Sequence, residues 1–165
     1  MKGSRSRIVD PVGLRVIGGK YHGKKLQYGG DQRVRPMKER VREAVFNLLG
    51  KATEGKFAVD LFAGTGALGI EAMSRGATAA LFLERHFPTS KIIGENLREV
   101  GVVEPSEIIF GDTFLQSRWT PKLPTEQPWC VFCCPPYELF VTQQDAMLTL
   151  IGSLNWRAPS PTSRR

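Results

Sequence analysis

The sequence lacks the features of a membrane protein, an exported protein and a disulfide-stabilised protein. No apolar run reaches the roughly 20 residues that a transmembrane helix needs, and no hydrophobic signal segment follows the basic N-terminus. The cysteines Cys130, Cys133 and Cys134 lie within five residues of one another, which excludes a disulfide framework. A reducing cytoplasm is therefore the expected location.

The composition, with 41% apolar and 24% charged residues, is that of a globular protein, and 165 residues suffice for one domain. The net charge of +7 is distributed unevenly along the chain. Residues 1–50 hold 12 Lys and Arg against 4 Asp and Glu, whereas residues 51–165 hold 11 against 12. A basic excess confined to one part of the chain favours a polyanionic partner such as nucleic acid.

Two elements are expected in this basic part. Residues 14–28 predict two short strands around a glycine-rich turn, with Val16, Tyr21 and Leu26 facing inward. A helix is expected from Pro36 to Leu49, ended by Gly50. Its predicted buried stripe consists of apolar residues at near-helical spacing, namely Val41, Ala44, Val45, Leu48 and Leu49, and its other face carries Lys38, Arg40 and Arg42.

From residue 57 onward, short apolar strands alternate with helices. Strands are expected over 57–62, 79–84, 107–110 and 129–133, helices over 67–75, 89–100 and 140–154, and a loop over 116–128. This alternation predicts a parallel α/β sheet, in which ligands bind at the carboxyl ends of the strands. Polar or special residues follow four expected strands, which predicts one shared ligand site: Asp60 to Gly66, Glu84, Asp112, and Cys134 to Tyr137.

The segment from Asp60 to Gly69 contains the pattern Gly-x-Gly-x-x-Gly between an expected strand and an expected helix. Dinucleotides and S-adenosylmethionine both fit such a loop, and Glu84 could bind the ribose hydroxyls of either ligand. Asp60 favours S-adenosylmethionine, because a carboxylate repels a pyrophosphate and attracts the ammonium and sulfonium groups. Asp112 could accept a hydrogen bond from the adenine amine.

The segment Trp129-Cys-Val-Phe-Cys133 only superficially matches a redox motif. Residues i and i+3 of a strand face opposite sides, so Cys130 and Cys133 are expected to be core residues. His22 and His86 lie in distant segments, so no metal site is expected. Cys134 is expected at the mouth of the ligand site.

At these residues the chain resembles the RsmD-type ribosomal RNA methyltransferases, which methylate guanine N2 in small-subunit 16S rRNA. The matching stretches are Arg15-Val-Ile-Gly-Gly-Lys-Tyr-His-Gly-Lys-Lys-Leu26, Arg35-Pro36, Arg40-Val-Arg-Glu-Ala-Val-Phe-Asn-Leu-Leu49, Asp60-Leu-Phe-Ala-Gly-Thr-Gly-Ala-Leu-Gly-Ile-Glu-Ala72 and Pro135-Pro136-Tyr137. Together they cover most of residues 14–140.

The resemblance implies a Rossmann-like class I methyltransferase sheet with a basic N-terminal β-hairpin and helix that hold RNA. It implies a basic RNA-binding extension over 1–50 and an S-adenosylmethionine-binding domain over 51–155, whereas the Pro-, Ser- and Arg-rich composition of residues 156–165 predicts a disordered tail. The implied cofactor contacts are Asp60, Phe62, Ala63, Gly64, Thr65, Gly66, Glu84 and Asp112. Catalysis is assigned to Cys134, Pro135, Pro136 and Tyr137, with Tyr137 stacking on the extruded base. The RNA contacts are expected at Arg15, Lys20, Lys24, Lys25, Arg33, Arg35, Arg40 and Arg42.

Three features depart from the family pattern. Cys134 stands where the family has Asp or Asn, and a thiol is a weak hydrogen-bond acceptor. Met37 stands where a threonine could cap the helix. The strands that complete the family's sheet are missing after Leu154, which would leave an edge unpaired.

The expected function is direct transfer of a methyl group from S-adenosylmethionine to the N2 amine of a guanine in small-subunit rRNA, by a monomer. The alternative that Cys134 and the short C-terminus raise is a catalytically impaired or truncated RNA-binding relative. A nicotinamide-dependent oxidoreductase is the third candidate.

Overall fold

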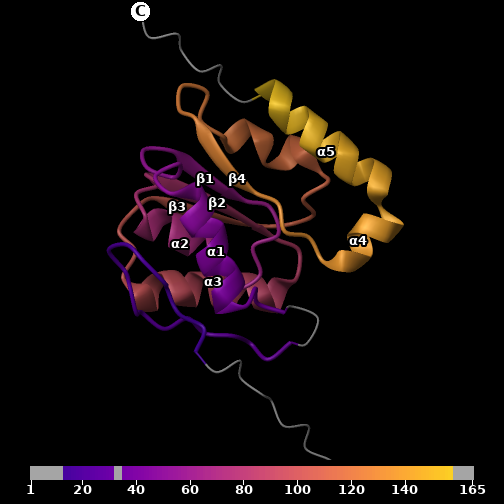
Figure 1. Cartoon of the computed structure of the whole chain (residues 1–165). Coiled ribbons are helices and arrows are strands. Elements are labelled where there is room, and N and C mark those ends of the chain that lie inside the picture. The colour runs from indigo at the N-terminus through magenta and orange to yellow at the C-terminus, as the bar shows by residue number, and fades with distance from the viewer. Residues whose placement is uncertain (1–12, 32–34, 158–165) are drawn as a thin grey trace, which may run out of the picture.

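A computed structural model describes residues 13–31 and 35–157, and its centre is a parallel four-stranded sheet (Figure 1). The strands are β1 (Phe57–Asp60), β2 (Ala79–Glu84), β3 (Ser106–Phe110) and β4 (Trp129–Phe132), in the spatial order β3-β2-β1-β4. The predicted parallel α/β sheet is confirmed. Within the described residues β4 pairs only with β1, so its other edge has no strand beside it.

Helices α2 (Ala67–Ser74) and α3 (Phe87–Val100) follow β1 and β2 and cover one face of the sheet. Ile70 and Ile93 from these helices pack there with Ala80 and Phe82 of β2, and all four side chains are buried. On the other face, α5 (Gln144–Arg157) packs Leu150 in a second cluster of buried apolar residues: Val59, Leu61, Leu81, Leu83, Trp119, Leu123 and Leu154. Alternate strand residues thus feed two separate cores, as the period of a strand requires.

Helix α1 spans Glu39–Leu49, three residues shorter than expected at its start, and Gly50 ends it as predicted. The predicted inward stripe is wrong. Val41 is 48% exposed and Leu48 89% exposed, while Arg42 and Phe46 are completely buried. Phe46 packs on Phe132 of β4 with ring centroids 5.6 Å apart, so tertiary contacts with the sheet set the orientation of the helix.

We call residues 14–28 the N-terminal arm. Val16, Tyr21 and Leu26 of the arm are buried in the core that α2 and α3 share, as predicted. The two strands of the predicted hairpin reduce to a single antiparallel bridge between Arg15 and Lys25, supported by backbone bonds on either side of it. The arm therefore follows the surface of α2 and α3 as a turn-rich segment.

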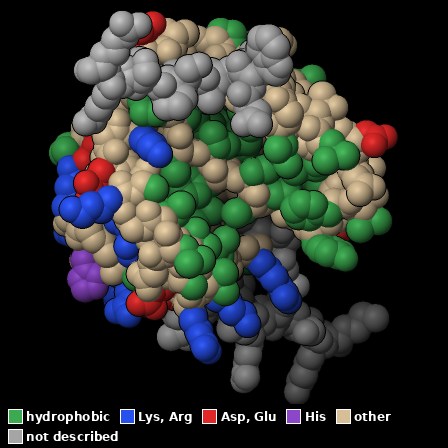
Figure 2. All heavy atoms as spheres, turned by 45° about the horizontal axis from the view of Figure 1, so that its top comes forward, with side chains coloured by type: hydrophobic (Ala, Val, Ile, Leu, Met, Phe, Trp, Pro, Cys, Tyr) green, Lys and Arg blue, Asp and Glu red, His purple; other side chains and the backbone are tan. Residues whose placement is uncertain are grey.

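The C-terminal part differs from expectation in two places. The predicted helix over 140–154 is two helices, α4 (Tyr137–Thr142) and α5, which meet at Gln143 with a non-helical φ of −135°. The predicted loop over 116–128 contains two 3₁₀ turns, Gln116–Arg118 and Thr120–Lys122, with Trp119 buried between them. Figure 2 shows apolar side chains gathered on the side that carries α4 and α5. The exposed apolar residues of these two helices include Phe140, Val141, Leu148 and Ile151.

The predicted basic tail over 1–13 lies almost entirely outside the described residues, as do Arg33 and residues 158–165 of the predicted C-terminal tail. Trp156 and Arg157, which the sequence assigns to that tail, belong to α5. In the described ranges, each helix is too short or too polar to span a bilayer.

Candidate functional site

The carboxyl ends of β1, β2 and β4 meet at one edge of the sheet. Asp60 of β1 lies in register with Phe82 of β2 and Phe132 of β4. The segment after β1 crosses the end of β2, where Ala63 donates its N–H to the Leu83 carbonyl at 2.9 Å. The loop turns through Gly64 and Gly66, whose φ angles of +55° and +82° lie in the region that only glycine enters easily.

Glu84, at the end of β2, holds this glycine loop. Its carboxylate accepts the Gly64 N–H at 2.8 Å through Oε2 and the His86 N–H at 2.9 Å through Oε1. Glu84, twenty residues after Gly64 in the sequence, therefore binds the glycine loop itself. The hydrogen bond fixes the carboxylate and the loop relative to each other. Each carboxylate oxygen has a second lone pair for a ligand hydroxyl.

Asp60 lies beneath the same loop with 1% of its surface exposed. Its Oδ2 accepts the Gly69 N–H at 3.1 Å, and its Oδ1 has no hydrogen-bond partner among the described residues. Burial, with a smaller contribution from the Glu84 charge, raises the pKa of Asp60 to about 7. A buried acceptor without a donor is costly, so this site fits a ligand that brings a positively charged or N–H group to it.

The remaining predicted cofactor residues line the same edge with different exposure. Ala63, Thr65 and Gly66 are buried, while Phe62 and Gly64 are half-buried. Asp112 follows β3 and is exposed, and its Oδ1 accepts the Phe114 N–H at 2.9 Å. Phe114 contacts the Phe62 ring edge-on with centroids 6.2 Å apart. An apolar wall thus lies beside an exposed carboxylate.

The segment Cys134 to Tyr137 leaves the end of β4 beside this loop, because Leu61 donates its N–H to the Phe132 carbonyl at 3.0 Å. Pro136 is the N-cap residue of α4, and Tyr137 in its first turn is 81% exposed. Burial and the nearby Asp60 carboxylate raise the pKa of the Cys134 thiol. The thiol is therefore protonated at neutral pH, which disfavours a role as nucleophile.

The other two cysteines lie as the strand pattern predicts. Cys130 packs against the core on the α2 and α3 face, and Cys133 packs against the core on the α5 face. All three cysteines are free, and the described residues contain no cluster of His, Cys, Asp and Glu suited to a metal ion.

The predicted RNA-contacting residues do not all lie on the surface. Arg42 is the clear correction: it is completely buried, and its guanidinium donates to the backbone carbonyls of Arg15 and Met37. Arg15 and Lys20 are exposed and form ion pairs, Arg15 with Glu39 at 2.9 Å and Lys20 with Glu104. Exposed members of the set also include Lys24, Lys25, Arg35 and Arg40.

The arm also reaches the glycine loop, which the sequence analysis did not anticipate. Asn96 of α3 is completely buried, and its amide donates to the Thr65 carbonyl at 2.8 Å while its oxygen accepts the Gln27 N–H at 2.6 Å. A cavity of about 40 Å³ lies next to this contact, between Tyr28 at the end of the arm, the following Gly29, Thr65, and the start of α3. An asparagine between Ile93 and Val100 on the buried side of α3 is the one sequence signal for this contact.

Comparisons with known proteins identify what the chain resembles as a whole. The model of the family described as Conserved hypothetical protein 95 matches residues 14–160. The chain is 33% identical over 138 residues to "Putative rRNA methyltransferase YlbH" of Bacillus subtilis, covering 84% of this chain and 73% of that protein. It is 30% identical over 149 residues to "Ribosomal RNA small subunit methyltransferase D" of Haemophilus influenzae, covering 89% and 75%. The solved structure "Putative methyltransferase yhhF from Escherichia coli" superposes with a TM-score of 0.65 at 28% identity, covering 84% of this chain and 71% of that chain.

Proposed function

Because the chain belongs to the Conserved hypothetical protein 95 family, the RsmD family of RNA methyltransferases, we propose that it methylates the N2 amine of a guanine in small-subunit rRNA. The methyl donor is S-adenosylmethionine. One observation carries the proposal: the glycine loop held by Glu84 and the exposed ring of Tyr137 meet at the same sheet edge. One group suits a cofactor, and the other suits an extruded base.

The residues of the loop fit S-adenosylmethionine in charge and shape. The unsatisfied Oδ1 of Asp60 would take the ammonium group, the free lone pairs of Glu84 would take the ribose hydroxyls, and Asp112 would take the adenine amine. Phe62, Ala63, Gly64, Thr65 and Gly66 would form the backbone cradle. When bound, the cofactor supplies an electrophilic methyl carbon.

The substrate side of the site has to orient a weak nucleophile, since the lone pair of the guanine amine is delocalised into the ring. Tyr137 would stack on the extruded guanine, and Pro135 and Pro136 fix the turn that presents it. The amine would attack the methyl carbon opposite the carbon–sulfur bond. That bond would break with its electron pair passing to sulfur, and the amine would release one proton to water. Because the Cys134 thiol is a weak acceptor, backbone carbonyls and positioning would aim the amine.

The test measures transfer of a labelled methyl group from S-adenosylmethionine to small ribosomal subunits carrying unmodified rRNA. The wild-type protein should label a single guanine at N2, and Tyr137→Ala should abolish labelling without changing cofactor affinity. Cys134→Asp should raise the rate by about tenfold, because a carboxylate accepts a hydrogen bond from the amine. Labelling only after Cys134→Asp would favour an impaired relative, and no labelling by either protein would refute the proposed reaction.

The remaining expectations follow from this substrate. Small subunits are assembled in the cytoplasm, so we propose that the protein acts there, as a monomer with the rRNA or the subunit as its partner. Analytical ultracentrifugation with and without a small-subunit rRNA fragment would test the monomeric state.

A further inference from the structure

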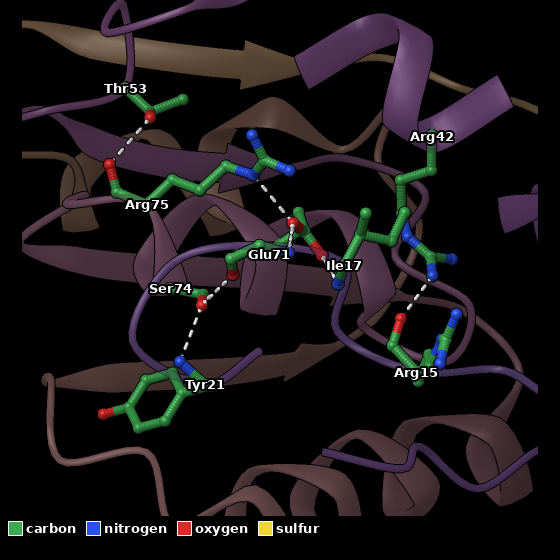
Figure 3. Close-up of polar contacts among 9 residues, drawn as sticks. Arg15, Ile17, Tyr21, Arg42, Thr53, Glu71, Ser74 and Arg75 are labelled. Carbon is green, nitrogen blue, oxygen red and sulfur yellow. Dashed lines mark hydrogen bonds and ion pairs between the residues drawn. The ribbon is translucent and has the colours of Figure 1, made fainter. Parts of the chain in front are cut away.

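A buried carboxylate holds the N-terminal arm on helix α2. Glu71 lies on α2 and is completely buried. Its Oε2 accepts the Ile17 N–H at 2.8 Å, and its Oε1 accepts the Gly18 N–H at 2.9 Å and the Arg75 Nε at 2.7 Å (Figure 3). Two of the three donors are backbone groups of the arm, so this one side chain fixes the arm in position.

Ser74, one turn further along α2, adds a second anchor. Its hydroxyl accepts the Tyr21 N–H at 2.9 Å and donates to the Gly18 carbonyl, as Figure 3 shows for the contact with Tyr21. The Ser74 carbonyl also accepts the Lys20 N–H at 2.9 Å. The turn of the arm therefore lies against the C-terminal end of α2, while the N-terminal end of α2 continues directly from the glycine loop.

The arm in turn holds α1. The buried guanidinium of Arg42 donates to the Arg15 carbonyl, and the Arg15 side chain pairs with Glu39 in the first turn of α1. Burial lowers the pKa of Arg42, and the charges of Glu71 and Glu39 oppose that effect. Arg40 is exposed in this first turn, and Arg35 is exposed four residues before the helix begins.

These contacts connect the glycine loop, through α2 and the N-terminal arm, to the basic first turn of α1. We infer that Glu71 is a positioning residue for RNA: it holds the arm, and through the arm the cations of α1, in the arrangement that binds the substrate. The inference rests on the proposed function. A clamped arm is already ordered before RNA binds, so binding does not carry the entropic cost of ordering it.

The test compares Glu71→Gln with Glu43→Gln in the full-length protein. Both variants remove one negative charge, but Glu43 is exposed on α1, so the pair separates loss of the clamp from a change in net charge. Glu71→Gln should raise the KM for unmodified small-subunit rRNA about tenfold and leave the Kd for S-adenosylmethionine within twofold. The slope of log K against log salt should stay unchanged, since no phosphate contact is lost.

Two further readouts separate positioning from a structural role. Amide exchange measured by NMR should accelerate at Ile17 and Gly18 in Glu71→Gln and not in Glu43→Gln. If Glu71→Gln does not fold, Ser74→Ala replaces it, with Ser90→Ala as control, because Ser90 is a buried serine of α3 whose hydroxyl donates to the Phe87 carbonyl of the same helix. Ser74→Ala should raise the KM for RNA about threefold, and Ser90→Ala should not.

An unchanged KM for RNA together with accelerated exchange would overturn the inference, because the arm would then be free without consequence for binding. A fall in kcat with unchanged KM would also overturn it, since that indicates loss of folded protein. If the wild-type protein binds rRNA but transfers no methyl group, the proposed reaction is refuted. The inference about Glu71 is then tested by comparing the dissociation constant for rRNA and the amide exchange rates of Glu71→Gln with those of Glu43→Gln.

Discussion

The N-terminal arm and helix α5 are attached to the two faces of the same sheet in different ways. The arm buries Val16, Tyr21 and Leu26, and polar side chains also hold its backbone, since Glu71, Ser74 and Asn96 each accept one of its N–H groups. Helix α5 is held by apolar side chains, with Leu150 and Leu154 buried on the other face of the sheet. Hydrogen bonds fix a position because they are directional, whereas apolar contact stabilises without selecting a direction.

This difference suits the two regions to different functions. Directional hydrogen bonds to the backbone hold a segment, and the charges it carries, at a fixed position. A helix that covers an apolar face is stabilised by the apolar area it buries. The comparison predicts that changes on the arm side alter binding as well as stability, and that changes on the α5 side alter stability alone.

The largest effect on stability is expected from Arg42→Ala. The substitution removes a buried cation that serves two backbone carbonyls and leaves Glu71 with less compensating charge. Unfolding in urea should show a loss of about 4 kcal/mol. Arg40→Ala, two residues away and exposed, is the control and should weaken RNA binding with little change in the urea midpoint. Similar midpoints for the two variants would refute the buried role of Arg42.

The next largest effect is expected from Leu150→Ala on the α5 side. Leu150 is completely buried among apolar residues, and its truncation should cost about 3 kcal/mol of the free energy of unfolding. The KM for RNA should not change in protein that remains folded. An increase in that KM comparable to the one expected for Glu71→Gln would remove the distinction between the two regions.

An intermediate effect is expected at Asp60, the buried charge between these regions. Its pKa is about 7 in the folded protein and 3.8 in the unfolded chain, so the folded state binds the proton more tightly. Stability is then greatest below pH 4 for this group and falls as the pH rises towards 7. Between pH 5 and pH 8 the wild-type protein should lose about 3 kcal/mol relative to Asp60→Asn in urea titrations. Parallel profiles would show that the carboxyl titrates normally.

The smallest effect is expected on the outer face of α5. Leu148 is 64% exposed, although it lies only two residues from Leu150. Leu148→Ser should change the free energy of unfolding by less than about 0.5 kcal/mol in the same urea experiment. A larger loss would show that this face is covered in solution, which light scattering at increasing concentration would reveal.

The sequence predicts the sheet, α2, α3 and the glycine loop well, because their signals are local. Gly64, Gly66 and Gly101 stand where positive φ angles are needed. The apolar segments between these glycines mark the strand and the helices. The orientation of α1 is not predictable in this way. Its apolar stripe suggested that Val41 and Leu48 face inward, yet Phe46 and Arg42 do, because the partners that decide the matter, Phe132 and the Arg15 carbonyl, are distant in sequence.

The function of Glu71 was missed for a related reason. The sequence shows one acid in an otherwise apolar helix, but its partners Ile17 and Gly18 are more than fifty residues away. The break between α4 and α5 lacks a glycine or proline at Gln143, so no local signal marks it. The motif and the strand ends predict the candidate site residues, whereas the contacts that position them depend on tertiary structure.

The turn of the arm has a consequence for engineering. Gly19 has a φ of +75°, and a Cβ built there would lie 1.9 Å from the Ser74 carbonyl oxygen, so no side chain fits without moving α2. A mutant library aimed at new RNA targets can vary Lys24 and Lys25, whose side chains are exposed, but has to leave position 19 unchanged. Gly19, the most tightly packed glycine of the arm, thus has to be kept in any redesign of the charges at positions 24 and 25.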